Sequence, residues 1–315
     1  MVSVIIPNYN HAIYLQERID SVLNQTYQDF EIIILDDKST DNSKKVIEQY
    51  RSHPKVSQIV YNEVNSGTTF KQWNKGIRLA KGELIWFAES DDAAANTFLE
   101  ELIKPFEQNP KLGIVYCDSY YMDEYGEKLK CTHLWKNERF STQRWEADYT
   151  NLGIDEVNNY LLFHNIIDNA SSALFSKRYI VKAGMANEKF RYAGDMLLYI
   201  KILMLSDIYY ISKPLNYFRD HAINTSKESF GNGLKYYELV LAHALIIKNK
   251  LVSQEAKNRS YGAELKNFKD FAYLSLKRNK KISLFLNKQL SLIMANPKFA
   301  AKLLSDQFYH KSSII

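Results

Sequence analysis

Short apolar runs alternate with helix-like segments through the first 92 residues of the chain. These runs are predominantly apolar and occupy residues 2–6, 30–35, 57–61 and 83–88. The segments between them have helical apolar spacing or helix-capping residues, and they occupy residues 12–25, 40–50 and 68–81. Continuously apolar strands are typical of strands that are buried on both faces. The repeat therefore predicts an α/β fold in which helices cover both faces of a mostly parallel sheet.

An acidic motif follows the last of these apolar runs. Glu89, Asp91 and Asp92 place three carboxylates within four positions. Like charges this close raise one another's pKa unless a positive charge lies between them. Carboxylates are the oxygen ligands that Mg²⁺, Mn²⁺ and Ca²⁺ prefer, and ligands bind at the carboxyl ends of strands in open α/β sheets. The motif therefore predicts a metal-dependent site.

Size and composition are those of a globular protein. With 315 residues and 46% hydrophobic content, the chain can form one large domain or two smaller ones. Two cysteines, Cys117 and Cys131, are too few for a disulfide framework and are expected to be reduced thiols. No apolar run approaches about 20 residues and no secretory signal is visible, so a cytoplasmic location is expected.

The pattern changes after residue 92. Helices are predicted over residues 96–108, 155–164, 176–183 and 195–205, and short strands over 113–117, 120–122, 207–212 and 215–218. Residues 132–153 have weak periodicity and are predicted to form a mobile loop over the site. From residue 234 onward the chain is predicted to be almost wholly helical.

Charge is distributed unevenly along the chain. Residues 231–315 carry a net charge of +10, whereas the rest of the chain carries −5. A basic C-terminal region favours an anionic partner, such as a membrane surface, a phosphate-bearing acceptor or a nucleic acid. The alternative is an ordinary solvated helical face.

Four blocks of sequence resemble one known family. They are VSVIIPNYN at 2–10, SVLNQTY at 21–27, FEIIILDDKSTD at 30–41 and AKGELIWFAESDD at 80–92. In this order they closely resemble family-two glycosyltransferases of the GT-A fold, and weaker similarity extends to about residue 226. The resemblance implies a GT-A domain over 1–230, with a nucleotide-binding half at 1–118 and an acceptor half at 119–230. A basic helical region at 231–315 would follow.

The resemblance also implies an activity. Such enzymes transfer a sugar, with inversion, from a nucleotide diphosphate sugar to an acceptor hydroxyl, and Mn²⁺ or Mg²⁺ binds the diphosphate. A UDP-sugar donor and a saccharide or lipid-linked saccharide acceptor are expected, and no nucleic-acid partner. The implied pathway is the assembly of a bacterial surface polysaccharide, namely a capsule, an O-antigen or an exopolysaccharide. The basic C-terminal helices would then contact the inner face of the plasma membrane.

The resemblance assigns the donor site to loops that follow strands. Pro7, Tyr9 and Asn10 would line the nucleotide base, and Asp37 would accept a hydrogen bond from it, which favours uracil. Lys71 lies near the position where relatives often carry a basic residue for the nucleotide. The alternative is structural, because Asn and Asp at strand ends also cap helices.

The metal and phosphate residues come from two segments. Asp91 and Asp92 would bind the metal, and Glu89 replaces the first aspartate of the family's Asp-x-Asp-Asp motif, with a role at ribose or metal. In a later segment, His221 would reach the metal or the diphosphate, and Arg219 would neutralise phosphate.

The general base is implied to be Asp195, where relatives usually carry Glu-Asp and this chain carries Gly194-Asp195. A helix N-terminus lowers the pKa of an aspartate, whereas proton abstraction benefits from a raised pKa, so burial must compensate. The alternative is a helix-capping aspartate. Four aromatic residues within 132–153 fit either acceptor stacking or ordinary packing: Trp135, Phe140, Trp145 and Tyr149.

Three other functions are weighed against this one. A dinucleotide-binding oxidoreductase needs a glycine-rich turn after the first strand, and residues 7–10 do not provide one. A nucleotidyltransferase would show a basic, glycine-rich phosphate loop near the first helix, and none is present there. A non-catalytic sugar-binding or scaffold protein with the same fold is the main alternative, because Glu89 and Gly194 depart from the family pattern.

Overall fold

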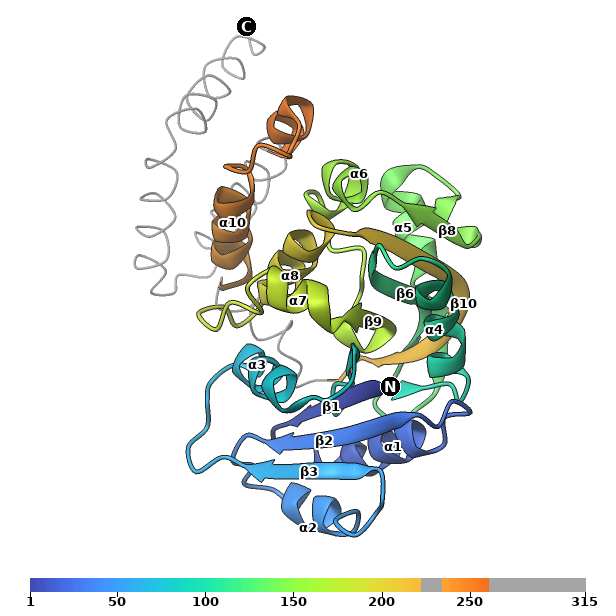
Figure 1. The fold of residues 1–315 in the computed structure, drawn as a ribbon, viewed down its shortest axis with the longest axis vertical. Coiled ribbons are helices and arrows are strands. Elements are labelled where there is room, and N and C mark those ends of the chain that lie inside the picture. Colours follow the sequence, from blue (N-terminus) through green and yellow to red (C-terminus); the bar gives the residue numbers. More distant parts are fainter. Residues whose placement is uncertain (222–233, 261–315) are drawn as a thin grey trace, which may run out of the picture.

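The computed structural model describes residues 1–221 and 234–260, and a single mixed sheet of ten strands forms its centre (Figure 1). The main strand order is β3-β2-β1-β4-β9-β6-β10-β5, with β7 paired to β6 and β8 paired to β10. The strands are β1 (Val2–Asn8), β2 (Phe30–Asp36), β3 (Val56–Tyr61), β4 (Leu84–Phe87), β5 (Ala93–Ala94), β6 (Leu112–Met122), β7 (Lys128–Cys131), β8 (Tyr149–Asn151), β9 (Ala173–Ser176) and β10 (Asp207–Arg219).

The helices alternate with these strands in the first half of the chain and cluster in the second. They are α1 (Ala12–Leu23), α2 (Ser43–Glu48), α3 (Thr69–Leu79), α4 (Phe98–Gln108), α5 (His133–Phe140), α6 (Gly153–Glu156), α7 (Lys177–Lys182), α8 (Gly194–Leu203) and α10 (Leu234–Ile246). Shorter helical turns are η1 (Arg144–Glu146), the π-helical η2 (Val157–Leu161) and η3 (Ala170–Ser172).

Strands β1 to β4 pair in parallel, as the repeated strand–helix pattern predicts. β1 pairs in parallel with both β2 and β4, and β2 pairs in parallel with β3. Beyond β4 the pairing changes, because β9 inserts antiparallel between β4 and β6, while β10 lies parallel to β6. The predicted α/β fold is therefore confirmed, and the sheet as a whole is mixed.

Two hydrophobic cores lie on opposite faces of the sheet. Because side chains alternate along a strand, neighbouring residues of β2 enter different cores. Ile32 and Ile34 pack with residues of α1 and α4, whereas Ile33 and Leu35 pack with residues of α3 and α8. This explains why the strands read as predominantly apolar runs, and it fixes their ends at one common edge.

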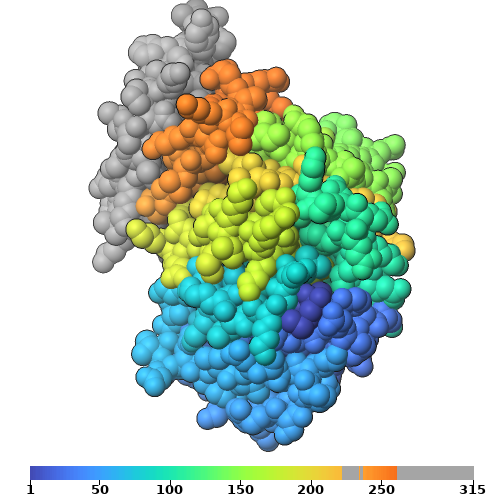
Figure 2. All heavy atoms as spheres, viewed as in Figure 1, coloured from blue at the N-terminus to red at the C-terminus, as the bar shows by residue number. Residues whose placement is uncertain are grey.

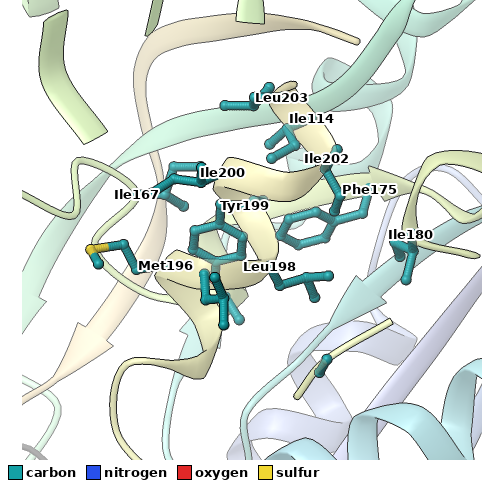
Figure 3. Close-up of a cluster of buried hydrophobic side chains, with 14 of the residues drawn as sticks. Ile114, Ile167, Phe175, Ile180, Met196, Leu198, Tyr199, Ile200, Ile202 and Leu203 are labelled. Atoms are coloured by element: carbon teal, nitrogen blue, oxygen red, sulfur yellow. The ribbon is translucent and has the colours of Figure 1, made fainter. Parts of the chain in front are cut away.

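Helix α8 lies inside the second core. Nearly all of its residues are buried, and Figure 3 shows Met196, Leu198, Tyr199 and Ile202 pointing to different sides of the helix within one cluster. The ring of Tyr199 stacks on that of Phe175 at 5.4 Å. A helix buried on all sides is held firmly, so the position of its first turn is well defined.

The segment 132–153 is not the irregular loop that its weak periodicity predicts. It contains α5, η1 and β8. Trp145 is fully buried and donates a hydrogen bond from Nε1 to Tyr116 Oη at 2.9 Å, and its ring packs against Phe140 and Tyr160. Aromatic packing therefore stabilises this segment, although its sequence has no clear periodicity. Because Trp145 is buried in this packing, it is not available for the predicted stacking on an acceptor.

The C-terminal region is described in part. Helix α10 lies beside α8 and away from β2 and β3, and the chain is helical again over residues 254–260 (Figure 1). The helices and basic residues predicted beyond 260 lie outside the described residues. Within the described part, no helix is both long and apolar enough to span a bilayer. The division into halves at residue 118 and a C-terminal region at 231 stays a prediction.

Candidate active site

The carboxyl ends of the parallel strands bring the acidic motif and two other loops to one edge of the sheet. The loops after β1, β2 and β4 meet there because these strands run in the same direction. Strand β5 follows the acidic motif and pairs with β10 through Ala93 and Tyr217. This pairing brings the end of β10, with Arg219 and His221, against Asp91 and Asp92.

Asp91 faces two histidines. Its Oδ2 lies 3.0 Å from Nε2 of His221. The rings of His221 and His11 meet edge to face at 5.5 Å, and His11 Nδ1 lies 2.9 Å from Ser90 Oγ. Ligand atoms of Asp91, His11 and His221 all lie within 4.8 Å of one another. One carboxylate and two imidazoles thus form a group that could hold a divalent cation.

Asp92 turns away from this cluster. Its Oδ2 accepts a hydrogen bond from Asn169 Nδ2 at 2.6 Å, and its Oδ1 accepts one from the backbone N–H of Arg219 at 3.0 Å. Asp92 is only 2% exposed, and Arg18 Nη2 lies 3.9 Å from it. The two adjacent aspartates therefore differ, and the geometry does not support Asp92 as a direct metal ligand.

The electrostatics of the motif separate its three acids. Burial and the charge of Asp91 raise the pKa of Glu89 to about 8 and that of Asp92 to about 7. Burial also opposes ionisation of Asp91, but the hydrogen bond from His221 and the charges of both histidines outweigh it and lower the pKa of Asp91. Of the three acids in the motif, Asp91 is therefore the one that ionises most readily.

Arg219 stabilises the motif. It is 2% exposed, and its Nε donates to the backbone oxygen of Asp91 at 2.8 Å. Its Nη1 donates to the carbonyls of Asp123 and Glu124, and its Nη2 pairs with Glu17. All three guanidinium nitrogens thus bind protein groups. The side chain fixes the acidic motif and the end of β10, and its expected role at the donor phosphate stays a prediction.

The loops after β1 and β2 bind each other. Asn10 has a positive φ of 57°, and its Oδ1 accepts a hydrogen bond from the N–H of Thr40 at 2.7 Å. Its own N–H donates to Ser39 Oγ at 2.9 Å. Pro7 is buried within β1, whereas Tyr9 is 46% exposed at the same edge. Of the predicted base-contacting residues, Tyr9 is thus the one that presents a free ring.

Asp37 binds the loop that precedes α3. Its Oδ1 accepts hydrogen bonds from Asn62, Ser66 and Gln72 at 2.6–3.0 Å, and its Oδ2 accepts one from Ser66 Oγ at 2.7 Å. Lys71 is exposed and donates to the backbone oxygen of Ser66 at 2.9 Å. Asp37 therefore shapes this loop, and Oδ2 keeps more accepting capacity than Oδ1.

Asp195 lies in the first turn of α8, as the sequence predicts. Its Oδ2 accepts a hydrogen bond from Asn165 Nδ2 at 3.0 Å. Burial raises its pKa to about 6, although hydrogen bonds from its own N–H, from Met196 and from Asn165 act in the opposite direction. The effect of burial on the pKa of Asp195 is thus larger than the opposite effect of the helix N-terminus, and a raised pKa is what a general base requires.

Glu89 links the acidic motif to helix α8. Its Oε1 accepts a hydrogen bond from Trp73 Nε1 at 2.7 Å, and Trp73 meets the ring of Phe70 edge to face at 5.2 Å. A Cβ atom on Gly194 would lie 2.4 Å from the ring of Phe70. The glycine before Asp195 is therefore required by packing, and the glutamate common in relatives has no space here.

The model of one family, glycosyl transferase family 2, matches residues 3–169. The chain belongs to this family. The matched segment contains the acidic motif, the loops after β1 and β2, and Asn169. Asp195, Arg219 and His221 lie outside the matched segment.

Some relatives of this family-2 glycosyltransferase align with most of its length. An uncharacterized glycosyltransferase of Rickettsia prowazekii is 28% identical over 301 residues, which cover 95% of this chain and 86% of that protein. Among solved structures, S. aureus TarS 1–349 in complex with UDP is similar with a TM-score of 0.66 at 20% identity, covering 96% of this chain and 82% of that TarS fragment.

A second structural neighbour is the mannosyltransferase PcManGT of Pyrobaculum calidifontis in complex with GDP-Man and Mn²⁺. It aligns with a TM-score of 0.60 at 18% identity, over 96% of this chain and 83% of that one. At these identities the likeness shows the fold alone. The predicted GT-A fold and membership among family-two glycosyltransferases are both confirmed.

Several residues of the glycosyltransferase site were not predicted. His11, Arg18, Asn165 and Asn169 complete the surroundings of the acids, and none lies in a conspicuous motif. His11 follows Asn10 directly, so its position at a strand-end loop was a usable signal. Nothing local marks the two asparagines, because their contacts are distant in sequence.

Proposed function

We propose that this family-2 glycosyltransferase transfers a sugar, with inversion, from a UDP-sugar to a hydroxyl of a saccharide or lipid-linked saccharide. The observation that carries the proposal is the acidic motif at the sheet edge together with Asp195, whose helix contacts Phe70 beside Trp73, the partner of Glu89. Asp91 with two histidines is suited to a cation, and Asp195, a carboxylate whose pKa is raised to about 6, is suited to a base. Polysaccharide assembly at the cytoplasmic face of a membrane is the setting that we infer for it.

The residues of the first site suit a divalent metal. Asp91 offers an ionised oxygen, and His11 and His221 offer imidazole nitrogens. Mg²⁺ strongly favours oxygen ligands, so this mixed set favours Mn²⁺. Such a cation supplies positive charge that stabilises the departing nucleotide diphosphate. Arg219 and Ser90 hold the backbone and one imidazole in place, which is the role of groups just outside a metal's ligands.

The second site provides the proton acceptor. Asn165 orients the Asp195 carboxylate, and the buried helix α8 fixes the position of Asp195. Above about pH 6 the carboxylate is ionised and can take the proton of an acceptor hydroxyl. Attack of that oxygen on C1 in a single displacement inverts the configuration of the sugar.

Two features support a UDP-sugar. TarS structures contain UDP and UDP-GlcNAc, although PcManGT contains GDP-Man. In this chain Asp37 is an acceptor with remaining capacity on Oδ2, which fits the N–H of a uracil ring. Tyr9 offers an exposed ring at the same edge for stacking.

The metal assignment is tested by comparing variants of the two adjacent aspartates, Asp91 and Asp92. UDP plus Mn²⁺ is expected to raise the melting temperature of the wild type and of Asp92→Asn above that seen with UDP alone. Asp91→Asn and His221→Ala are expected to lose this Mn²⁺-dependent increment. An increment retained in Asp91→Asn, or lost equally in Asp92→Asn, contradicts the assignment.

The reaction is tested by release of UDP and by the anomeric configuration of the product. Asp195→Asn is expected to bind UDP and Mn²⁺ normally but to reduce transfer by at least about 10²-fold, because general-base catalysis contributes about 10²–10⁴-fold. A product of retained configuration, or undiminished transfer by this variant, refutes the mechanism. A wild type that binds UDP-sugars but never transfers them would support a non-catalytic protein.

A further inference from the structure

Helix α10 reaches the base-bearing helix from a part of the chain that the family model does not match. Ala242 and Ile246 of α10 are buried in the same hydrophobic core as Met196 and Leu197 of α8. Figure 2 shows the orange residues of this region lying against the yellow and green residues of the acceptor half. The helix is therefore packed against the body of the enzyme.

One carboxylate on α10 binds the segment immediately before α8. Glu238 is 3% exposed, and its Oε1 accepts a hydrogen bond from the N–H of Arg191 at 2.8 Å. Its Oε2 accepts hydrogen bonds from the N–H groups of Tyr192 and Ala193 at 2.7 and 2.9 Å. Three successive backbone donors thus converge on a single buried side chain.

These donors lie at a position where a carboxylate has a strong effect. Ala193 is the N-cap of α8, and Arg191 and Tyr192 directly precede it, so Glu238 lies near the N-terminus of the helix, where the helix dipole favours a negative charge. Ala193 is the residue directly before Gly194, and Asp195 follows in the first turn. Glu238 therefore fixes the backbone from which the proposed base projects.

A second contact of α10 binds the segment that contains Asn165, the hydrogen-bond donor to Asp195. His243 is buried, and its Nδ1 and Nε2 lie 2.8 and 2.6 Å from the backbone oxygens of Leu239 and Leu162. Leu162 belongs to the segment that continues to Asn165, which donates to Asp195. Both segments that hold the Asp195 carboxylate are thus bound to one helix.

We propose that Glu238 is a positioning residue for Asp195, acting through the three hydrogen bonds that hold residues 191–193. The inference rests on the proposed role of Asp195 as general base. It extends the active site to α10, and it gives this C-terminal helix a part in acceptor activation.

The surroundings of Asp195 allow the charge of Glu238 to be detected separately from its geometry. Among the described residues, Asn165 and the N–H of Met196 bind Asp195 and are neutral, and Tyr199 lies one turn further along α8. Glu238 faces it from α10, and its negative charge adds to the effect of burial in raising the pKa of Asp195. Removing this charge should therefore lower that pKa.

Two variants separate these effects. Glu238→Gln keeps one acceptor oxygen but replaces the other with an amide that cannot accept from Arg191. We expect its kcat to fall about 10-fold, and the acidic limb of kcat/KM for the acceptor to move to lower pH. Glu238→Asp keeps the charge but withdraws it by one methylene, so kcat should fall while the acidic limb stays in place. Glu255→Gln, an exposed acid in the same region, should match the wild type.

The measurements are made below the melting temperature of every variant, with UDP and Mn²⁺ affinity as the test of an intact donor site. Donor affinity within about twofold of the wild type, together with the two pH profiles above, supports positioning. The positioning proposal is overturned if Glu238→Gln has the kcat of the wild type. It is also overturned if the kcat of this variant falls while the acidic limb of its kcat/KM profile does not move. If Asp195→Asn transfers sugar normally, the base assignment itself has failed; if that variant is inactive while Glu238→Gln is normal, only the positioning proposal has failed.

Discussion

Gly194 allows a decisive test of how the base-bearing helix is packed. A Cβ atom at this position would lie 2.4 Å from Cε2 of Phe70, and 2.7 Å from two further atoms of the same ring. Phe70 is 2% exposed and meets Trp73 edge to face, so its ring has little freedom to move. Gly194→Ala therefore forces either the ring or the first turn of α8 to shift.

The magnitude follows from two opposing contributions. Overpacking a core by a methyl group costs about 1–3 kcal/mol. Replacing glycine by alanine within a helix gains up to about 1 kcal/mol, and less at the first residue of the helix, which Gly194 is. The free energy of unfolding should thus fall by about 1–2 kcal/mol. Because Asp195 is the next residue, transfer should also fall by about 10–100-fold, as expected for a misplaced catalytic group.

Urea unfolding of a double-mutant set isolates the contact. Phe70→Leu removes the ring, so Gly194→Ala in that background should be neutral or slightly stabilising. The coupling between the two substitutions should then be at least about 1 kcal/mol, a size typical of residues in direct contact. The stability of each variant is taken from the midpoint of its urea unfolding curve. The comparison requires that the slope of the unfolding free energy against urea concentration is the same in all variants.

The reasoning fails if Gly194→Ala stabilises the wild type, or if its effect is the same with and without the Phe70 ring. Gly194→Glu provides a second discrimination. It restores the residue that relatives usually carry, yet the Phe70 contact predicts lower activity and lower stability than Gly194→Ala. A gain in transfer would show that Gly194 is a functional deficiency and not a packing requirement.

Three other predictions use buried charges. The pH profile of kcat/KM should fall below about pH 6, because Asp195 is a base only when ionised and its pKa is raised to about 6; a profile flat to pH 5 would contradict this. Lys136→Met should cost about 3–5 kcal/mol in urea unfolding, since it leaves Asp168, 2.6 Å away and buried, without its cation. Arg219→Lys should weaken Mn²⁺ binding in a titration, since a single ammonium cannot bind all the carbonyls that the guanidinium holds.

The sequence predicts the parallel half of the fold well because its signals there are local. Apolar runs that are buried on both faces, with a helix between each pair, define β1 to β4 and their common edge. Once that edge is known, Glu89, Asp91 and Asp92 must lie at it. The position of Asp195 at a helix start was equally clear, because the residues before α8 give way to an apolar run at 196–205 that only Lys201 interrupts.

The second half is less predictable because long-range packing decides it. Strand β9 is only four residues long and leads straight into α7, so its sequence shows the helix more clearly than the strand. Trp145 lies in a segment without periodicity and is stabilised by rings that are distant in sequence, such as Tyr116. Glu238 has no local signal either, since its partners at 191–193 approach it only through the packing of α10 on α8.

The different roles of Asp91 and Asp92 follow from geometry that composition cannot reveal. Both residues follow the same strand, and both carboxylates are largely withdrawn from water, so their chemistry in isolation would be equal. Asp92 accepts hydrogen bonds from an amide and a backbone N–H and lies 3.9 Å from the Arg18 guanidinium, whereas Asp91 is bound by His221 with His11 nearby. The surroundings of Asp92 thus satisfy its carboxylate with two neutral donors and a permanent guanidinium charge, without a metal. Imidazoles can exchange their proton for a metal, so in the proposed site Asp91 is the residue through which metal binding and the charge at the donor would be coupled.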